Sequence, residues 1–304
     1  MKKILLMAVA ALMAMSAIAQ TTVKKIRVYE GNTVVYEQRY AAVDSVVFFD
    51  EIIPVQVETN GALPGEFSVS ANKKVKFSKG NLQYVNSTWQ FAENQLDRSV
   101  NVNAGVDYFG WGTGDAPLKN SMINSDYSTF HEWGANPIAN GGNEANMWRT
   151  PTKDEWVYLF HGRTNASKLF GFGTVNGVEG VIILPDNWVT PDGITFNPNT
   201  MSWSSSSSGS GGYGGGSDNF SKNYYNQATW NTMQAIGAVF LPATQYQDEW
   251  FGGYWSATPY DSNNAYSLEF DKTFLSPQYV CLNCNPAYSA RYLPYSVRLV
   301  QDVE

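Results

Sequence analysis

Apolar and polar residues alternate in short runs along most of the chain, a pattern typical of β-strands that bury one face. The alternation is clear over residues 67–77 and returns in the C-terminal runs GYWSATPY, AYSLEF and YSVRLV. A separate group of short apolar runs occupies residues 23–50, where the letters EGN at 30–32 predict a turn. The pattern therefore predicts antiparallel strands connected by short turns.

Two segments show the spacing of helices instead. In TPTKDEWVYLFHGR, Thr152 and Glu155 have the spacing of a capping box, and Gly162 offers a C-terminal stop. Three apolar residues then share one face of this predicted helix: Trp156, Leu159 and Phe160. A second helix is predicted over residues 228–236 with Thr229 as its cap, followed by a buried strand at 238–241.

These elements predict an α+β protein with two helices and short antiparallel strands. Its main domain is predicted at 65–304, preceded by a small β-strand unit at 20–52 and a Pro- and Gly-containing linker at 53–64. Residues 202–220, SWSSSSSGSGGYGGGSDNF, are predicted to form a flexible surface insertion because they carry little apolar area to offset the entropy of ordering. A phosphate-binding loop is disfavoured there, since no Gly-Lys-Ser/Thr closes the glycine-rich run.

The N-terminus has the features of a leader. Two lysines precede an apolar run at 4–15, and the letters AIA at 17–19 match a small-x-small cleavage site. We therefore predict a signal peptide over residues 1–19, cleaved after Ala19, and a mature protein that is secreted, periplasmic or at the cell surface. The sequence after the leader holds no apolar run long enough for a transmembrane segment.

Composition narrows the classes of partner. The formal net charge is −7, and removal of the two leader lysines makes the mature chain more acidic still. Nucleic-acid binding needs clustered Lys and Arg, so we expect no nucleic-acid partner. Aromatic residues make up 14% of the chain and charged residues only 15%, which suits a loop-rich exported protein.

The sequence offers no clear catalytic or metal-binding cluster. His131 and His161 each lack a second histidine at ligand spacing, and the carboxylate pair Asp154/Glu155 is adjacent, so its side chains diverge. We therefore predict no catalytic residue, no metal and no cofactor. Ten tryptophans favour an aromatic core over an exposed sugar-binding platform.

The two cysteines, Cys281 and Cys284, form a C-x-x-C. A structural zinc site would need two more ligands, and a thioredoxin-like pair would precede a helix, whereas Pro286 and loop-like residues follow here. A local disulfide in an oxidising compartment stays open.

Several separated motifs resemble one family. MWRTPTKDEWVYL resembles the W-R-x-P-T-x-x-E-W segment of formylglycine-generating-enzyme-like and related C-type lectin folds. FLPATQYQDEWFGGYWSATPYDSNNAYSLEF, followed by YSVRLV, resembles the C-terminal end of secreted Bacteroidetes proteins with that fold, and FSVSANKKVKFSKGNLQY resembles their domain opening. The resemblance covers residues 65–301 and implies a C-type-lectin-like fold.

Many proteins with this C-terminal layout are variable proteins of diversity-generating retroelements. There, mutation at adenines converts Asn codons into many others, but never into Lys, Glu, Gln, Met or Trp codons. The seventeen residues 279–295 contain none of these five types. The resemblance therefore implies a variable region within 255–300 that binds a ligand, in which the two cysteines are incidental outcomes of diversification. The implied ligand-binding residues are Tyr260, Asp261, Asn263, Asn264, Tyr279, Cys281, Leu282, Asn283, Cys284, Asn285, Tyr288, Tyr292 and Leu293.

The expected partner is a protein or glycan on another cell, a phage or a host surface. Calcium-dependent lectins carry Glu-Pro-Asn or Gln-Pro-Asp with Trp-Asn-Asp, and this chain has neither, so calcium-dependent sugar binding is not implied. Two alternatives stay open: a formylglycine-generating-enzyme-like or glycan-processing enzyme, and a sugar-binding or envelope structural protein with a fixed loop.

Overall fold

The computed structural model describes residues 24–30, 33–40, 60–99, 106–205, 211–246, 249–280 and 289–303. The chain divides into two compact units, Met1–Glu51 and Ile52–Glu304. The predicted α+β class is confirmed, because strands dominate the described residues and only two short α-helices accompany them. The predicted signal peptide lies outside the described residues.

The smaller unit contains a β-hairpin. Strands β1 (Lys24–Glu30) and β2 (Thr33–Tyr40) pair antiparallel, with a register shift between Val28 and Tyr29. This agrees with the turn predicted from the EGN cluster. A two-stranded hairpin is marginally stable in water by itself.

The larger unit is built from four sheets in its described part. The largest has the order β13-β14-β15-β16-β10-β9, with all pairs antiparallel. Its strands are β13 (Thr244–Tyr246), β14 (Glu249–Pro259), β15 (Ala265–Asp271), β16 (Phe274–Tyr279), β10 (Gly212–Gly214) and β9 (Ser202–Ser204). The second sheet comprises β11 (Tyr224–Tyr225), β7 (Phe170–Val175), β8 (Val178–Ile183) and β12 (Val239–Pro242).

Two small sheets complete the unit. One comprises β17 (Val300–Asp302), β4 (Lys73–Phe77) and β3 (Phe67–Ser70), and the other comprises β5 (Leu82–Val85) and β6 (Thr88–Phe91). Because β17 pairs with β4, the last strand of the larger unit lies beside its second strand, and β3 lies on the other side of β4. Short 3-10 turns lie between the strands: η1 (Asn124–Tyr127), η2 (Trp133–Ala135), η4 (Ala166–Lys168) and η5 (Phe220–Lys222).

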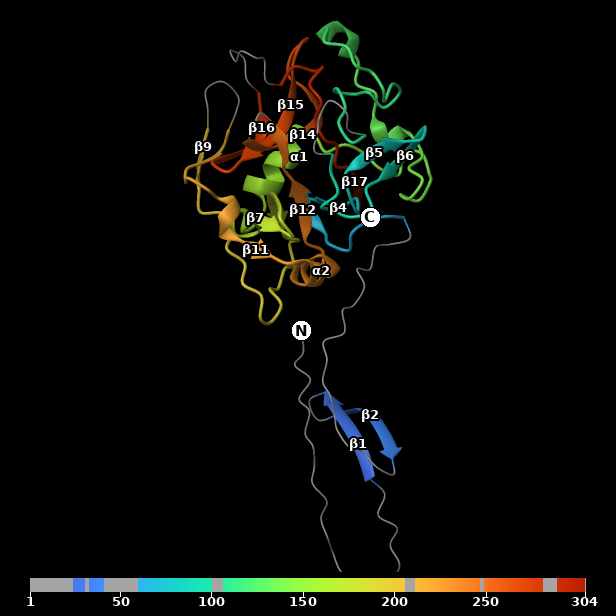
Figure 1. Cartoon of the computed structure of the whole chain (residues 1–304), viewed down its shortest axis with the longest axis vertical. Helices are drawn as coiled ribbons and strands as arrows, with labels where there is room; N and C mark the ends of the chain where they lie inside the picture. The colour runs from blue at the N-terminus through green and yellow to red at the C-terminus, as the bar shows by residue number, and fades with distance from the viewer. Residues whose placement is uncertain are drawn as a thin grey trace, which may run out of the picture. The chain divides into compact units, whose positions relative to one another are not determined.

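Helix α1 (Lys153–Val157) begins at the predicted capping box. The Thr152 side chain accepts from the Glu155 backbone N–H, and the Glu155 side chain accepts from the Thr152 backbone N–H. The helix continues as a π-helical turn, η3 (Tyr158–Gly162), which ends at the predicted glycine. Figure 1 shows α1 at the centre of the larger unit, between the six-stranded and the four-stranded sheets.

Helix α2 (Gln227–Ala235) matches the second predicted helix, but its cap is different. Asn226, not Thr229, is the N-cap, and its side chain accepts from the Thr229 backbone N–H at 2.9 Å. Asn and Thr are both good caps, and the structure places the extended backbone that a cap requires at Asn226.

The core is rich in aromatic side chains, as predicted. Seven of the ten tryptophans are buried: Trp89, Trp111, Trp133, Trp148, Trp156, Trp230 and Trp255. Trp156 and Phe160 on the predicted apolar face of the first helix contact Phe77 and Phe170 across the main core cluster.

Two predictions made from the sequence differ from the structure. Ala62 and Leu63, placed in the predicted linker, are buried, and the Leu63 N–H donates to the Phe77 carbonyl at 2.8 Å, so the larger unit begins before residue 65. The described parts of 202–220 are not a flexible insertion. Strands β9 and β10 extend the edge of the large sheet, because Tyr213 and Phe220 supply the buried aromatic area that the Gly- and Ser-rich composition conceals.

Candidate functional site

The described residues of the predicted binding region lie together at one end of the internal strands β14, β15 and β16 of the six-stranded sheet. Pro259 pairs with Ala265 across the loop between β14 and β15, and Ser267 pairs with Tyr279 at the end of β16. The backbone N–H of Ala265 donates to the Ser289 carbonyl, which brings the next segment to the same place. We call this region, residues 260–264, 279–280 and 289–293, the loop edge. It lies at the upper end of the larger unit in Figure 1.

Loop 260–264 is held in one compact turn. The Asp261 carboxylate accepts from the backbone N–H groups of Asn263, at 2.8 Å, and Asn264, at 2.7 Å, and also from the Asn264 side-chain amide. Burial by itself would raise the pKa of Asp261, but these hydrogen bonds outweigh it and hold the pKa below its ordinary value. The carboxylate thus acts as a fixed acceptor inside the loop.

Arg291 joins the parts of the loop edge. The residue is 5% exposed, and its guanidinium donates to the backbone carbonyls of Asp261 and Asn264 on one side. On the other side it donates to the carbonyls of Tyr127 and Ser128, both at 3.1 Å.

Aromatic stacking fixes the same guanidinium. Its central carbon lies 4.3 Å from the ring centroid of Trp111, and the backbone N–H of Trp111 donates to the Arg291 carbonyl at 2.7 Å. One buried cation therefore orders carbonyls from two loops and rests on a buried tryptophan.

The predicted site residues differ in their exposure. Asp261 and Asn263 are exposed, and four others are half-buried: Tyr260, Asn264, Tyr279 and Tyr292. Leu293 is partly buried against a core cluster, so it supports the loop as well as reaching the surface. The remaining six lie outside the described residues: Cys281, Leu282, Asn283, Cys284, Asn285 and Tyr288.

The C-terminal part of the 279–295 window is an anchor more than an exposed loop. Ser289, Ala290, Arg291 and Tyr295 are all buried, and backbone bridges join Ala290 to Asn264 and Tyr295 to Phe109. These four side chains fill space beneath the loop edge and are not part of its exposed surface.

A buried carboxyl group lies under this anchor. Glu269 on β15 is 1% exposed, and its carboxyl accepts from the Ser267 hydroxyl at 2.8 Å. Burial raises the pKa of Glu269 to about 8. Burial and the neighbouring Glu269 also raise the pKa of Tyr295 well above its ordinary value. A neutral acid is therefore the favoured form of Glu269 at neutral pH.

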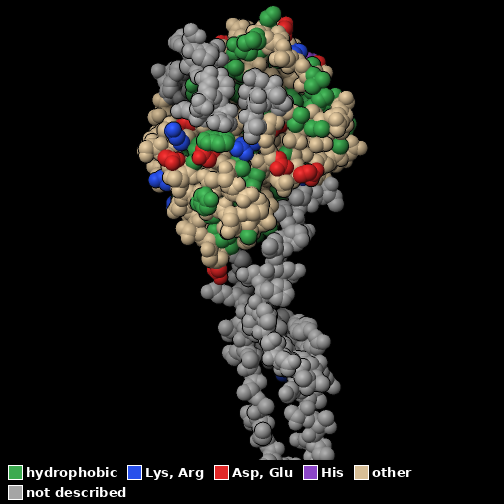
Figure 2. All heavy atoms as spheres, in the orientation of Figure 1, with side chains coloured by type: hydrophobic (Ala, Val, Ile, Leu, Met, Phe, Trp, Pro, Cys, Tyr) green, Lys and Arg blue, Asp and Glu red, His purple; other side chains and the backbone are tan. Residues whose placement is uncertain are grey.

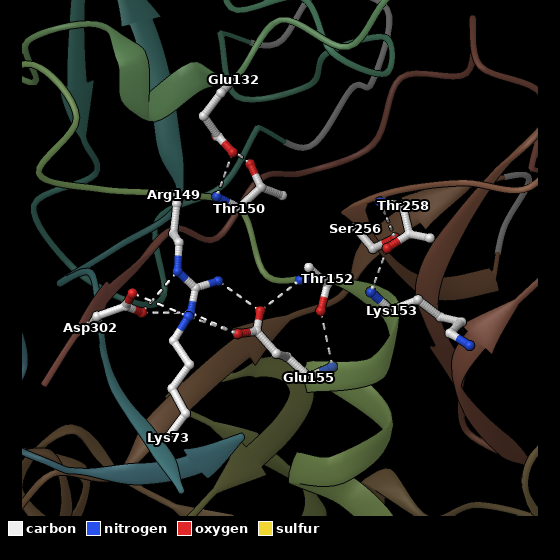
Figure 3. Close-up of polar contacts among 10 residues, drawn as sticks. All are labelled: Lys73, Glu132, Arg149, Thr150, Thr152, Lys153, Glu155, Ser256, Thr258 and Asp302. Carbon is white, nitrogen blue, oxygen red and sulfur yellow. Dashed lines mark hydrogen bonds and ion pairs between the residues drawn. The ribbon is translucent and has the colours of Figure 1, made fainter. Parts of the chain in front are cut away.

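The W-R-x-P-T-x-x-E-W motif builds a polar network that positions the sheet (Figure 3). Arg149 donates to both oxygens of Glu155, each at 2.7 Å, and to Asp302 of the last strand at 2.6 Å. Lys73 of β4 lies 3.1 Å from the same Asp302 carboxylate. The network ties the start of α1 to strands β4 and β17.

The same motif reaches toward the loop edge. The backbone N–H of Lys153 donates to the Thr258 hydroxyl at 3.0 Å, one residue before β14 ends (Figure 3). The Lys153 ammonium lies 5.4 Å from the Tyr266 ring centroid, and Tyr266 in turn contacts the Tyr260 ring edge to face. The motif residues therefore have a structural role that extends to the first tyrosine of the loop edge.

Neither histidine belongs to the loop edge. The His131 ring nitrogen lies 3.5 Å from Asp115, and the His161 ring stacks on Trp203 at 4.0 Å between centroids. Among the described residues, no group of three or more His, Cys, Asp or Glu side chains is placed to hold a metal ion. Within the same described ranges, no helix has the length and apolar character needed to cross a membrane.

Sequence reasoning missed Arg291 and its partner Trp111. The available signal was that Arg291 is the single charged residue in the segment 279–295, although a lone charge does not reveal which carbonyls it orders. Compared with protein-family models, with curated proteins and with solved structures, the chain gives no match in any of the three.

Proposed function

We propose that the larger unit is a C-type-lectin-like binding domain of an exported protein, and that the loop edge, with residues 281–288, recognises a macromolecular or cell-surface ligand. The observation that carries this proposal is the clamping of two loops by one buried arginine at the ends of the internal strands of a large sheet. A rigid frame that presents exposed polar and tyrosine side chains suits recognition, because less entropy is lost on binding.

The composition of the loop edge supports the same function. Tyr, Asn, Ser and Asp side chains combine amphipathic contact area with adaptable hydrogen bonding, as they do in antibody paratopes. Functional residues are often carried on loops that a rigid scaffold positions. The buried side chains of Ser289, Ala290, Arg291 and Tyr295 support the scaffold beneath the exposed residues.

The variable-region part of the proposal is tested by sequencing codons 255–300 and the neighbouring DNA in many cells of one strain. Adenine-restricted variation beside a near-identical repeat would support a diversified binder. A uniform sequence without a repeat would refute diversification and leave a protein with a fixed loop.

The binding part is tested on the purified mature chain with two probes: a phage-displayed library of short random peptides and an array of cell-surface glycans. We expect Tyr260→Ala combined with Tyr292→Ala to abolish selected binding. Tyr224→Ala is the matched control, since Tyr224 is 77% exposed on β11 of another sheet. Binding that survives the double change would contradict the proposal, and activity that depends on Cys281 or Cys284 would favour the enzyme alternative.

A further inference from the structure

A second surface lies beside the loop edge. Three of the most exposed large apolar side chains in the described residues fall within one stretch of six: Leu118 is 81% exposed, Met122 is 78% and Ile123 is 61%. We call residues 116–127 the apolar loop. Figure 2 shows apolar side chains reaching the surface in the upper part of the larger unit, above a belt of charged ones.

The apolar loop cannot easily turn these side chains inward, because it is held by its own hydrogen bonds. The Tyr127 hydroxyl donates to the Ser121 carbonyl at 2.9 Å and accepts from the Ser121 N–H at 3.1 Å. The Ser121 hydroxyl in turn donates to the Asp126 carboxylate and accepts from the Ile123 N–H. The Tyr127 ring is buried, packed so closely on Gly110 that a Cβ there would lie 2.2 Å from it.

The apolar loop and the loop edge are joined directly. Arg291 donates to the carbonyls of Tyr127 and Ser128 with the same guanidinium that orders Asp261 and Asn264. The two surfaces are therefore fixed relative to each other by a buried side chain. The C-terminal end of the apolar loop therefore adjoins the loop edge.

The chemistry of the apolar loop favours one class of partner. Leu, Met and Ile side chains gain free energy when they leave water for another apolar surface, whereas sugar rings stack on aromatic faces. The charged residues of the region are Asp115, Lys119 and Asp126, and the Lys119 ammonium is engaged by the Asp126 carbonyl at 2.7 Å and the Tyr127 ring. Two aspartates and one engaged lysine do not favour binding to an anionic membrane, because such a membrane attracts clustered basic side chains.

We propose that Leu118, Met122 and Ile123 form a constant hydrophobic anchor next to the loop edge, and that the partner is a protein with an exposed apolar patch. The inference rests on the proposed function, since it assigns a partner class to the same binding face. The anchor supplies affinity that does not depend on the variable residues, and the loop edge supplies selectivity.

The test uses the full mature chain, the phage-displayed peptides and the glycan array, together with vesicles of phosphatidylcholine and phosphatidylglycerol. Selection should enrich peptides that contain several apolar residues. The triple change Leu118→Ser, Met122→Ser and Ile123→Ser should weaken their binding by about tenfold or more. Val189→Ser with Ile236→Ser is the matched control, since both are exposed apolar residues in other parts of the larger unit.

Comparison with the Tyr260→Ala and Tyr292→Ala variant separates the two proposals. If both the triple serine variant and the tyrosine variant lose peptide binding at unchanged melting temperature, the result supports the hydrophobic anchor formed by Leu118, Met122 and Ile123. Loss with the tyrosine variant alone refutes the anchor and leaves the proposed function intact, whereas loss with neither refutes both. Binding to glycans or to vesicles without peptide selection overturns the assignment of a protein partner.

Discussion

Glu269→Gln is the change whose effect follows most directly from the structure. The Glu269 carboxyl lies buried on β15, beneath the buried side chains that support the loop edge, and it accepts a hydrogen bond from the Ser267 hydroxyl. Glutamine keeps the side-chain shape and the acceptor but removes the titrating proton. The substitution therefore isolates the free energy of ionising a buried acid.

The sign follows from the two protonation equilibria. Burial raises the pKa of Glu269 from its ordinary value of 4.5 to about 8 in the folded protein. Between these values the folded state holds a proton that the unfolded state has released, so the free energy of unfolding falls as the pH rises. The stabilisation is complete below the unfolded pKa and is lost as the pH passes the folded pKa.

The magnitude is large for one residue. Each pH unit within this window changes the free energy of unfolding by about 1.4 kcal/mol, so the loss between about pH 5 and about pH 9 is on the order of 4 kcal/mol. Glu269→Gln should remove this dependence. The difference in stability between the variant and the unchanged protein should accordingly grow by that amount, in favour of the variant, across the same window.

The assay is urea unfolding followed by tryptophan fluorescence at a series of pH values, with stability extrapolated to zero denaturant. Comparing the two proteins cancels other groups, including Asp107, whose pKa burial also raises. Glu144→Gln, which alters an exposed glutamate, is the matched control and should give a curve parallel to that of the unchanged protein. Parallel curves for Glu269→Gln as well would show that Glu269 is ionised in the folded state and would refute the reasoning.

Three further substitutions test the scaffold and the clamp. Arg149→Ala removes the partner of Glu155 and Asp302 and should lower the free energy of unfolding by about 2 kcal/mol, measured by the same urea titration; no change would show that the network is dispensable. Asn226→Ala should cost about 1 kcal/mol by loss of the helix cap, while Thr229→Ala should cost less, and the reverse order would contradict the assigned cap. Arg291→Met should leave the core folded but raise amide hydrogen exchange at 260–264, and unchanged exchange there would argue against its role as a clamp.

The sequence predicts local structure correctly where the interacting residues lie within one helical turn or one pair of strands. The capping box of Thr152 and Glu155 is confirmed because both hydrogen bonds join residues three positions apart. The alternation around Val75 and Phe77 likewise marked a strand, and both side chains are buried. The second helix lies where the sequence predicts it, but its cap is Asn226 and not the predicted Thr229, because two residues of capping type lie three positions apart and only the backbone conformation distinguishes them.

The prediction made from the composition of the Gly- and Ser-rich segment 202–220 is wrong for its described parts. Low apolar content predicted no ordered structure, yet one tyrosine, Tyr213, fills a core site and its hydroxyl donates to the Phe160 carbonyl at 3.0 Å. The sheet edge offered by β16 supplied the backbone partners that the segment could not supply for itself. A sheet edge of this kind is created by the fold and leaves no mark in the local sequence.

The sequence by itself determined the class of the fold, the helix start at Thr152 and the clustering of candidate binding residues near the C-terminus. Only the tertiary structure decided that Arg291 orders carbonyls 30 and 164 positions away, or that Glu269 loses contact with water. Helix caps and strand alternation depend on neighbours along the chain, which a sequence displays. Clamping and desolvation depend on groups brought together by chain folding, so the identity of their partners is fixed only when the sheets and loops have packed.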